Sequence, residues 1–337
     1  MKKIMFMILL FLIPSYAYAN DLSEEQLNQT IQQIIDWKKQ EHQIPTTSPL
    51  LQNPFLQNAG TTTGDWYPFA IGRAGISDDY DAYLAVIQDT VQKRYKELGG
   101  LDATKATEWH RISLAILALG GDPTNIGGIN LIEDGTYNRG LKAPLDLQGL
   151  NGLIWGLITL DSMRYEVPDN AANSRQDIIG AILAAQLKDG GFSFYHDTSD
   201  PDITAMALQA LAPYANSFET FTYKTQQTGE TMTKTVRQVI EEALVALQSL
   251  QLPTGDFGSW GEANAESTAQ VLVALTALQI DPLTDERFIK NGKNIINGIM
   301  RYAQPDGGFV HSETYSSDNP TSLPDVSNSM ASEQVLY

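Results

Sequence analysis

The sequence predicts an all-α toroid in which six outer helices alternate with six inner helices, and two observations support this class. The first is a repeated loop in which Gly-Gly precedes Phe, at Gln186–Phe192 and Gln304–Phe309, with a third copy at Gln251–Trp260 in which Gly-Asp precedes Phe. The second is a small hydroxyl residue that opens an Ala-rich apolar stretch after each loop. These hydroxyl residues recur every 64 positions, as Thr204, Thr268 and Ser332. A fixed period of this kind is the signature of a repeat architecture.

Weaker copies of the same unit precede the clear ones. They are centred on Gly64–Tyr67, Glu108–His110 and Leu147–Asn151, and each leads into another apolar stretch. Together with the three clear copies they make six repeats. Six helix pairs would close a ring, and an open superhelix of helical hairpins is the alternative.

The two kinds of helix differ in how their apolar residues are distributed. Residues 233–251 place Val and Leu side chains on one stripe with helical spacing, which predicts an outer helix with one solvated face. The stretches that follow the loops are apolar nearly all round, so we expect them to be inner helices buried on both sides. Outer helices are expected at 24–37, 80–98, 173–187, 233–251 and 286–303, with a weak, Gly-rich one near 122–132.

The repeated loops have a simple physical interpretation. Gly-Gly permits a left-handed backbone at low steric cost. We expect the following Phe to fill the seam between helix pairs, and the preceding Gln to hydrogen-bond the next repeat. All these loops lie at one end of the ring, where the N-termini of the inner helices also converge.

That end is the predicted ligand pocket, because helix dipoles place partial positive charge there. Asp, Asn and Ser are preferred N-caps, so capping is the alternative role for several candidates. The polar and aromatic residues predicted to bind a ligand are Trp66, Tyr67, Trp109, His110, Asn151, Asp202, Asn264, Glu266, Ser267, Asn328 and Glu333.

Composition excludes several classes of function. The formal charge is −18, from 22 basic and 40 acidic residues, which argues against nucleic-acid binding. There is no Cys, so disulfides, thiolate zinc sites and cysteine nucleophiles are excluded, and 4 His make a His-rich metal site unexpected. We expect no metal and no cofactor.

The N-terminus indicates export. Lys2 and Lys3 precede an apolar run over Ile4–Ile13, and Ala17-Tyr18-Ala19 provides a small-x-small cleavage pattern. This is typical of a secretory signal peptide at residues 1–19. We therefore expect a secreted or cell-surface protein without an integral membrane segment, with the toroid domain over residues 20–337.

Two segments depart from the repeat. Residues 217–235 alternate Thr with apolar residues around Gln226–Gly229, which predicts a β-hairpin at the end opposite the pocket; a solvated loop is the alternative. The last inner helix begins near Asn328 and reaches Tyr337 without a stop signal, so we expect it to be truncated.

The loops and the helices that follow them resemble the squalene cyclase and protein prenyltransferase repeat. The motif is Gln-x-x-x-Gly-Gly-Phe at residues 186–192, followed by Asp202–Leu211. Within that family, Asn264–Gln270 and Met330–Tyr337 are most similar to exported bacterial surface proteins with a transcobalamin-like barrel. The resemblance implies an α6/α6 toroid over roughly residues 24–337.

The resemblance implies three functions, which the residues separate. Protein prenyltransferases need a Cys-containing zinc site, which this chain lacks. Class II terpene cyclases use the central Asp of Asp-x-Asp-Asp as general acid; Asp202 and Asp200 match two positions, but Ile203 replaces the last Asp. Corrinoid-binding relatives contact their ligand through an Asp and an Asn that correspond to Asp202 and Asn264.

We therefore hypothesise a non-catalytic toroid whose partner is a large amphipathic ligand, corrinoid-like or isoprenoid-like. Such a corrinoid would be a ligand, not a catalytic cofactor. One alternative is a terpene-cyclase-like enzyme that uses Asp202, supported by Asp200. Another is a cell-surface interaction scaffold that contacts a surface partner through the Thr-rich hairpin.

Overall fold

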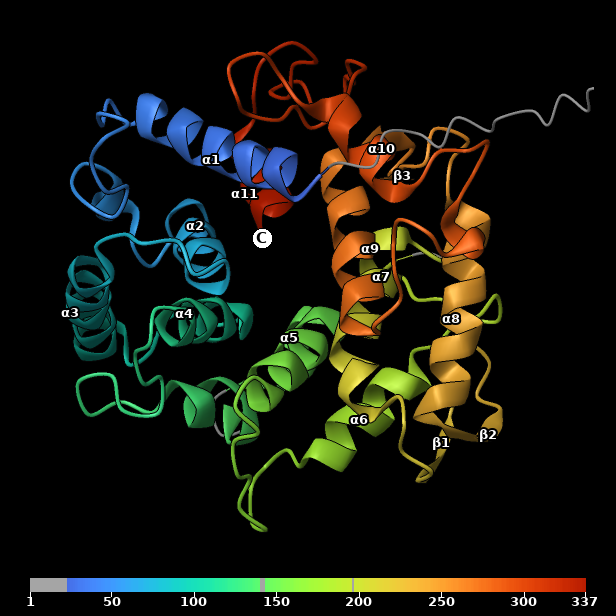
Figure 1. The fold of residues 1–337 in the computed structure, drawn as a ribbon. Coiled ribbons are helices and arrows are strands. Elements are labelled where there is room, and N and C mark those ends of the chain that lie inside the picture. The colour runs from blue at the N-terminus through green and yellow to red at the C-terminus, as the bar shows by residue number, and fades with distance from the viewer. Residues whose placement is uncertain (1–22, 140–142, 196) are drawn as a thin grey trace, which may run out of the picture.

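The computed structural model describes residues 23–337 except 140–142 and His196, and its helices surround a common centre (Figure 1). The signal peptide predicted at residues 1–19 lies outside the described residues. Within them, no helix is long and apolar enough to cross a membrane.

The inner layer of the ring is a closed circuit of helices. Each inner helix packs against the next, and α11 returns to contact α2. This closure is what a toroid requires and what an open superhelix lacks. The inner helices are α2 (Thr62–Arg73), α4 (Thr107–Ala118), α5 (Leu150–Asp161), α7 (Pro201–Leu211), α9 (Ala265–Ala277) and α11 (Ser329–Leu336).

The outer layer is less regular than the sequence predicts. Four predicted outer helices are present as α1 (Glu24–Glu41), α3 (Tyr80–Leu98), α6 (Arg175–Ala184) and α8 (Val236–Leu250). The helix predicted over 286–303 is reduced to α10 (Ile295–Ile299) between two 3-10 turns, Glu286–Phe288 and Met300–Tyr302. Near 122–132 there is no regular helix, and a π-helical turn follows at Glu133–Tyr137.

Both irregular outer positions have the same cause. A tight turn is closed by a backbone bridge between Lys290 and Lys293 in one case, and between Ile126 and Ile129 in the other. The turns need left-handed backbone, at Gly292 and at Gly127 among others. Such a turn interrupts the helical ladder, so an apolar stripe with helical spacing does not become a single helix there.

Each clear repeat is fixed by one hydroxyl group. The side-chain oxygen at the start of the inner helix accepts a hydrogen bond from the backbone N–H of the loop phenylalanine. The pairs are Phe192 to Thr204 (2.9 Å), Phe257 to Thr268 (3.0 Å) and Phe309 to Ser332 (2.9 Å). All three Phe side chains are buried, as the seam-filling prediction requires.

The loop glycines fix how closely neighbouring repeats approach. Gly190, Gly255 and Gly307 have φ of 96°, 91° and 95°. A Cβ added to them would lie 2.7, 2.3 and 2.8 Å from a backbone oxygen of the next outer element, at Glu242, Asn294 and Gln33. Because Gln33 belongs to α1, the last loop packs on the first outer helix, and the outer layer closes there.

The predicted Gln contacts are present in two of the three clear repeats. The Gln186 side-chain amide donates to the carbonyl of Gly190 in its own loop at 2.7 Å, and to that of Val239 in α8 at 3.3 Å. Gln251 donates to Gly255 at 3.0 Å and to Phe288 of the next repeat at 2.9 Å. These bonds satisfy buried carbonyls across the seam between repeats.

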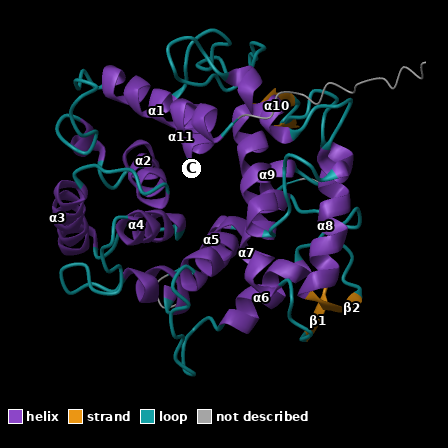
Figure 2. Ribbon diagram, in the orientation of Figure 1, coloured by secondary structure: helices purple, strands orange, loops and turns teal. Residues whose placement is uncertain are grey.

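Two small antiparallel sheets lie outside the inner ring, shown in orange in Figure 2. The predicted hairpin is present as β1 (Thr220–Lys224) and β2 (Thr231–Thr235). The expectation that it lies at the end opposite the pocket is wrong for its turn, because the N–H of Gln226 donates to Ala184 at the C-terminal end of α6 (2.7 Å). The second sheet, β3 (Phe257–Ser259) with β4 (Glu262–Asn264), was not predicted.

The hydroxyl contact predicts an isosteric test in α9. Thr268→Val removes the hydroxyl that accepts from the N–H of Phe257 and donates to the carbonyl of Asn264 (2.8 Å). The N–H of Phe257 and the carbonyl of Asn264 stay buried and lose this partner. We expect the free energy of unfolding to fall by about 1–3 kcal/mol in urea titrations. Thr276→Val, at an exposed position of the same helix, should change it by less than about 0.5 kcal/mol. Equal effects of the two substitutions would contradict the role given to Thr268.

Candidate functional site

A cavity of about 390 Å³ opens at the end of the ring where the inner helices begin. Every inner helix contributes side chains from its first turns, as the topology predicts. The lining side chains include acids, bases, amides, two indoles and two thioethers. They are Thr62, Trp66, Lys105, Thr107, Glu108, Arg111, Gln148, Asn151, Trp155, Asp202, Met206, Glu266, Gln270, Met330 and Gln334. We call this space the mouth cavity.

Four of the predicted ligand-binding residues line the mouth cavity: Trp66, Asn151, Asp202 and Glu266. The structure brings these four together from α2, α5, α7 and α9. The other candidates lie behind the lining or act as helix caps. They are Tyr67, Trp109, His110, Asn264, Ser267, Asn328 and Glu333.

Trp109 and His110 belong to the packing between the layers of the ring. The Trp109 indole N–H donates to the hydroxyl of Tyr95 at 2.7 Å, and the Arg139 guanidinium lies 4.1 Å from its ring centroid. His110 is buried with Nε2 2.9 Å from the carbonyl of Gly135. Burial lowers the pKa of His110 to about 3, so its ring is neutral.

Three candidates are helix caps, which is the alternative that the sequence left open. Asn264 accepts from the N–H of Ser267 at 2.7 Å, and its amide donates to Ser259 and to the carbonyl of Glu262. Asn328 caps α11 and Asp200 caps α7 in the same way. Asn264, the counterpart of the corrinoid-contacting Asn in the resemblance, thus has both ends of its amide engaged.

Asp202 is the predicted residue whose environment is most unusual. It lines the mouth cavity, and its Oδ1 is buried without a hydrogen-bond partner among the described residues. Burial, followed by the charge of Asp200, raises the pKa of Asp202 to about 6, although hydrogen bonds from Ser267 and Ser259 oppose the shift. Burial therefore outweighs the helix dipole in setting the pKa of Asp202. The carboxyl group is ionised above about pH 6 and gains a proton in mild acid.

Glu266 faces the cavity beside a histidine that the sequence analysis missed. Its Oε2 lies 2.8 Å from Nδ1 of His311, whose Nε2 lies 3.7 Å from Glu262. The hydrogen bond to Glu266 raises the pKa of His311 above its usual value. His311 comes two residues after the loop phenylalanine Phe309. Its backbone carbonyl accepts a hydrogen bond from the N–H of Ala265 in α9. No spacing in the sequence predicts this pairing.

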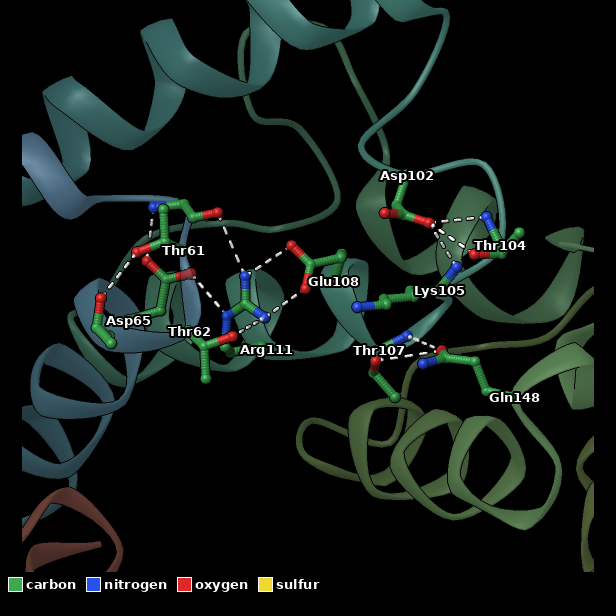
Figure 3. A network of polar contacts seen from close by, with 12 residues as sticks. Thr61, Thr62, Asp65, Asp102, Thr104, Lys105, Thr107, Glu108, Arg111 and Gln148 are labelled. Atoms are coloured by element: carbon green, nitrogen blue, oxygen red, sulfur yellow. Dashed lines mark hydrogen bonds and ion pairs between the residues drawn. The ribbon is translucent and has the colours of Figure 1, made fainter. Parts of the chain in front are cut away.

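The opposite wall is held by an ion-pair network that the sequence analysis also missed (Figure 3). Arg111 donates from Nε to Asp65 at 2.9 Å, and from its two terminal nitrogens to Glu108 at 2.6 and 2.8 Å. Tyr83 donates to the other oxygen of Asp65 at 2.8 Å. A buried guanidinium is thus neutralised on two sides, so Arg111 is fixed in place and carries little free positive charge into the cavity.

Glu333 lies in α11 between two residues that line the cavity, Met330 and Gln334, but does not line it itself. It is fully buried, and neither carboxyl oxygen has a hydrogen-bond partner among the described residues. Burial raises the pKa of Glu333 to about 8, with Lys38 and Arg111 acting against the shift and Asp65 and Glu266 with it. Glu333 is therefore a neutral carboxylic acid at pH 7.

Aromatic rings form the floor of the mouth cavity. Trp66 lies with its ring centroid 5.3 Å from that of Trp155 and 5.4 Å from that of Tyr337. The hydroxyl of Tyr337 donates to Gln209 at 2.9 Å. Trp155 and Tyr337 also line a second cavity of about 370 Å³ on the far side of these rings. The mouth cavity is thus polar at its rim and apolar at its base.

No group of three or more His, Asp or Glu side chains in the described part of the chain is arranged to hold a metal ion. The carboxyl groups of the mouth cavity are instead paired with His311 and Arg111 or lie apart from one another.

Comparison with known proteins establishes the family. Residues 141–309, just over half of the chain, match the family described as "Prenyltransferase alpha-alpha toroid domain". The chain therefore belongs to the prenyltransferase alpha-alpha toroid family, in agreement with the fold.

Single proteins add little to this assignment. One similar solved structure is a possible member of the GH105 family from Salmonella enterica subsp. enterica serovar Paratyphi A str. ATCC 9150. It is 12% identical with a TM-score of 0.46, and the match covers 93% of this chain and 92% of that chain. A likeness of this degree carries no argument about function. No curated protein matches this chain.

The raised pKa of Glu333 predicts a pH-dependent stability. Its proton is kept in the folded state up to about pH 8 but lost near pH 4.5 in the unfolded chain, so stability falls as pH rises between these values. Glu333→Gln removes this loss. We expect the variant to gain on the order of 4 kcal/mol relative to wild type between about pH 5 and pH 8 in urea unfolding. Glu286→Gln, at an exposed acid, is the control, and a pH-independent difference for Glu333→Gln would contradict the prediction.

Proposed function

We propose that this chain is a ligand-binding toroid whose site is the mouth cavity and which performs no chemistry on its ligand. The observation that carries the proposal is a pair of buried acceptors, Oδ1 of Asp202 and Oδ1 of Asn151, without partners among the described residues. Buried polar atoms in proteins are nearly always hydrogen-bonded, so these two oxygens favour an occupant that donates to them.

The same cavity suggests the shape of the ligand. Its base is formed by the rings of Trp66 and Trp155, and Met206 and Met330 contribute thioethers to its walls. Apolar surfaces with a few directed polar groups are typical of small-molecule sites. A large amphipathic ligand fits this pattern, with donors facing Asp202 and Asn151 and an apolar part on the indoles.

Two ligand classes follow from the resemblance and the cavity. A corrinoid-like molecule carries side-chain amides that would donate to the two acceptors, and it would lie across the mouth with one face inward. An isoprenoid-like molecule would place its chain on the aromatic base. We propose further that the toroid consists of six repeats, and that the protein is exported and acts in solution outside the cell or at its surface.

The experiment is a calorimetric titration at pH 7.5 of cyanocobalamin and of farnesol as probes. Loss of one charge-assisted hydrogen bond in Asp202→Asn should weaken binding by about 1.5–3 kcal/mol, or roughly 10- to 100-fold. Asp200→Asn is the matched control. It removes the same charge two residues away, and Asn caps a helix as well as Asp does. Equal affinity of wild type and Asp202→Asn would remove Asp202 from the site.

A second candidate is an enzyme like the class II terpene cyclases, favoured by the pKa of about 6 at Asp202. Such an enzyme needs a strong acid held protonated in a closed apolar cavity. Here Asp200 is engaged as a cap and Ile203 is buried in the core, so neither supplies a second acid to Asp202. A cyclised product from geranylgeranyl diphosphate that disappears in Asp202→Asn would establish the enzyme and overturn the non-catalytic proposal.

A further inference from the structure

Trp260 occupies a strained position at the tip of the β3–β4 hairpin. Ser259 pairs with Glu262, so the turn has two central residues, Trp260 and Gly261, with φ of 55° and 86°. Positive φ at both positions defines a type I′ turn, which prefers Asn-Gly. A bulky side chain in this region is sterically unfavourable, yet the indole is 72% exposed and contributes little to the core. A costly, exposed aromatic side chain indicates a role outside folding.

A second exposed ring lies beside it. Tyr195, from the loop between α6 and α7, is 79% exposed, and its ring centroid lies 6.1 Å from that of Trp260. The two aromatic side chains come from neighbouring repeats, and both lie at the end of the toroid where the mouth cavity opens. They form an aromatic platform on the rim.

A groove of about 710 Å³ runs from this platform toward the mouth cavity. Tyr195 lines one end, and Gln148 and Asn151 line the other, where they also border the mouth cavity. Gln226 and Gln227, from the turn of the β1–β2 hairpin, complete one side. The turn is held there because Gln227 accepts from Lys188 at 2.9 Å and donates to the carbonyl of Asp197 at 3.2 Å. We call this space the rim groove.

The rim groove is almost uncharged on a strongly acidic chain. Its polar side chains are mainly amides, and Asp197 is its one charged lining residue within the described part of the chain. Amides both donate and accept hydrogen bonds, as hydroxyl groups do. Gln148 already accepts from Thr107 at 3.1 and 3.2 Å, so its NH₂ group is the part that can serve a ligand.

We propose that the rim groove and the Tyr195–Trp260 platform bind an uncharged oligosaccharide. The C–H faces of a sugar ring stack on aromatic rings, and its hydroxyl groups donate to and accept from the amides. Tyr and Trp provide large rigid contact areas at low entropic cost, which suits a flat exposed site. The rim groove borders the mouth cavity at Gln148 and Asn151, but saccharide binding in the groove does not require a ligand in the mouth cavity.

A proline-rich peptide is the other ligand that paired aromatic rings bind. It fits the groove less well, because a lining amide such as Gln226 presents an acceptor as well as a donor. Proline has no backbone N–H to donate to such an oxygen. Sugar hydroxyls can donate to it and accept from the same amide.

The test is a calorimetric titration of the full chain with chitohexaose, cellohexaose, maltohexaose and xylohexaose, and with a proline decamer. We expect at least one neutral hexasaccharide to bind, and Trp260→Asn to weaken that binding by at least about tenfold. Because Asn-Gly is the favoured type I′ pair, the melting temperature of Trp260→Asn should be equal to or above that of wild type. Loss of binding therefore cannot be attributed to unfolding.

Two control variants show whether the rim groove itself holds the saccharide. Phe218→Asn removes an aromatic side chain that is 89% exposed and does not line the groove, and should leave the affinity unchanged. Asp202→Asn, in the mouth cavity, should also leave saccharide binding unchanged. No binding of any neutral hexasaccharide, equal binding by Trp260→Asn, or binding of the proline decamer alone would overturn the proposal. Loss of saccharide binding in Asp202→Asn would overturn it too, because the sugar would then lie in the mouth cavity.

Discussion

The architecture depends on a hydroxyl group at the start of an inner helix that satisfies the backbone of the preceding loop. Without this hydroxyl, the backbone N–H of a deeply buried phenylalanine would have no hydrogen-bond partner. Burying the phenylalanine in the seam between helix pairs would then cost the free energy of an unsatisfied donor. The same residue belongs to the first turn of the helix, so it fixes the distance between the loop and the helix start. The polar residues on either side of it are thereby presented at one end of the ring.

The mouth cavity combines charged groups that are held in different ways. On the α4 side, Arg111 is neutralised by Asp65 and Glu108 in a rigid network. On the α7 and α9 side, Glu266 is paired with His311, whereas Asp202 keeps a buried oxygen without a partner among the described residues. Rigid, neutralised walls around a few available acceptors are suited to recognition, because a ligand then meets preorganised groups instead of ordering them.

Several local expectations were correct because they rest on periodicity and backbone chemistry. The outer helices α1, α3, α6 and α8 followed from one-sided apolar stripes, and the left-handed loop glycines followed from Gly-Gly before Phe. Where this reasoning was wrong, a competing local preference decided. Asn291-Gly292 and Gly127-Gly128 form tight turns that interrupt helical stripes. Trp109 and His110 looked like mouth residues, but their position in the first turn of α4 directs them into the packing between layers.

The sequence by itself determined the class of fold, the end of the ring where polar side chains gather, and four of the residues that line the cavity there. These depend on spacing along one helix or one loop, which the chain encodes locally. Only the tertiary structure decided that Arg111 is locked by Asp65, that His311 meets Glu266, that Glu333 is buried and neutral, and that Tyr195 stands beside Trp260. Each of these facts joins residues from different repeats. Their distances and pKa values arise from burial and from neighbours that come together only when the ring closes.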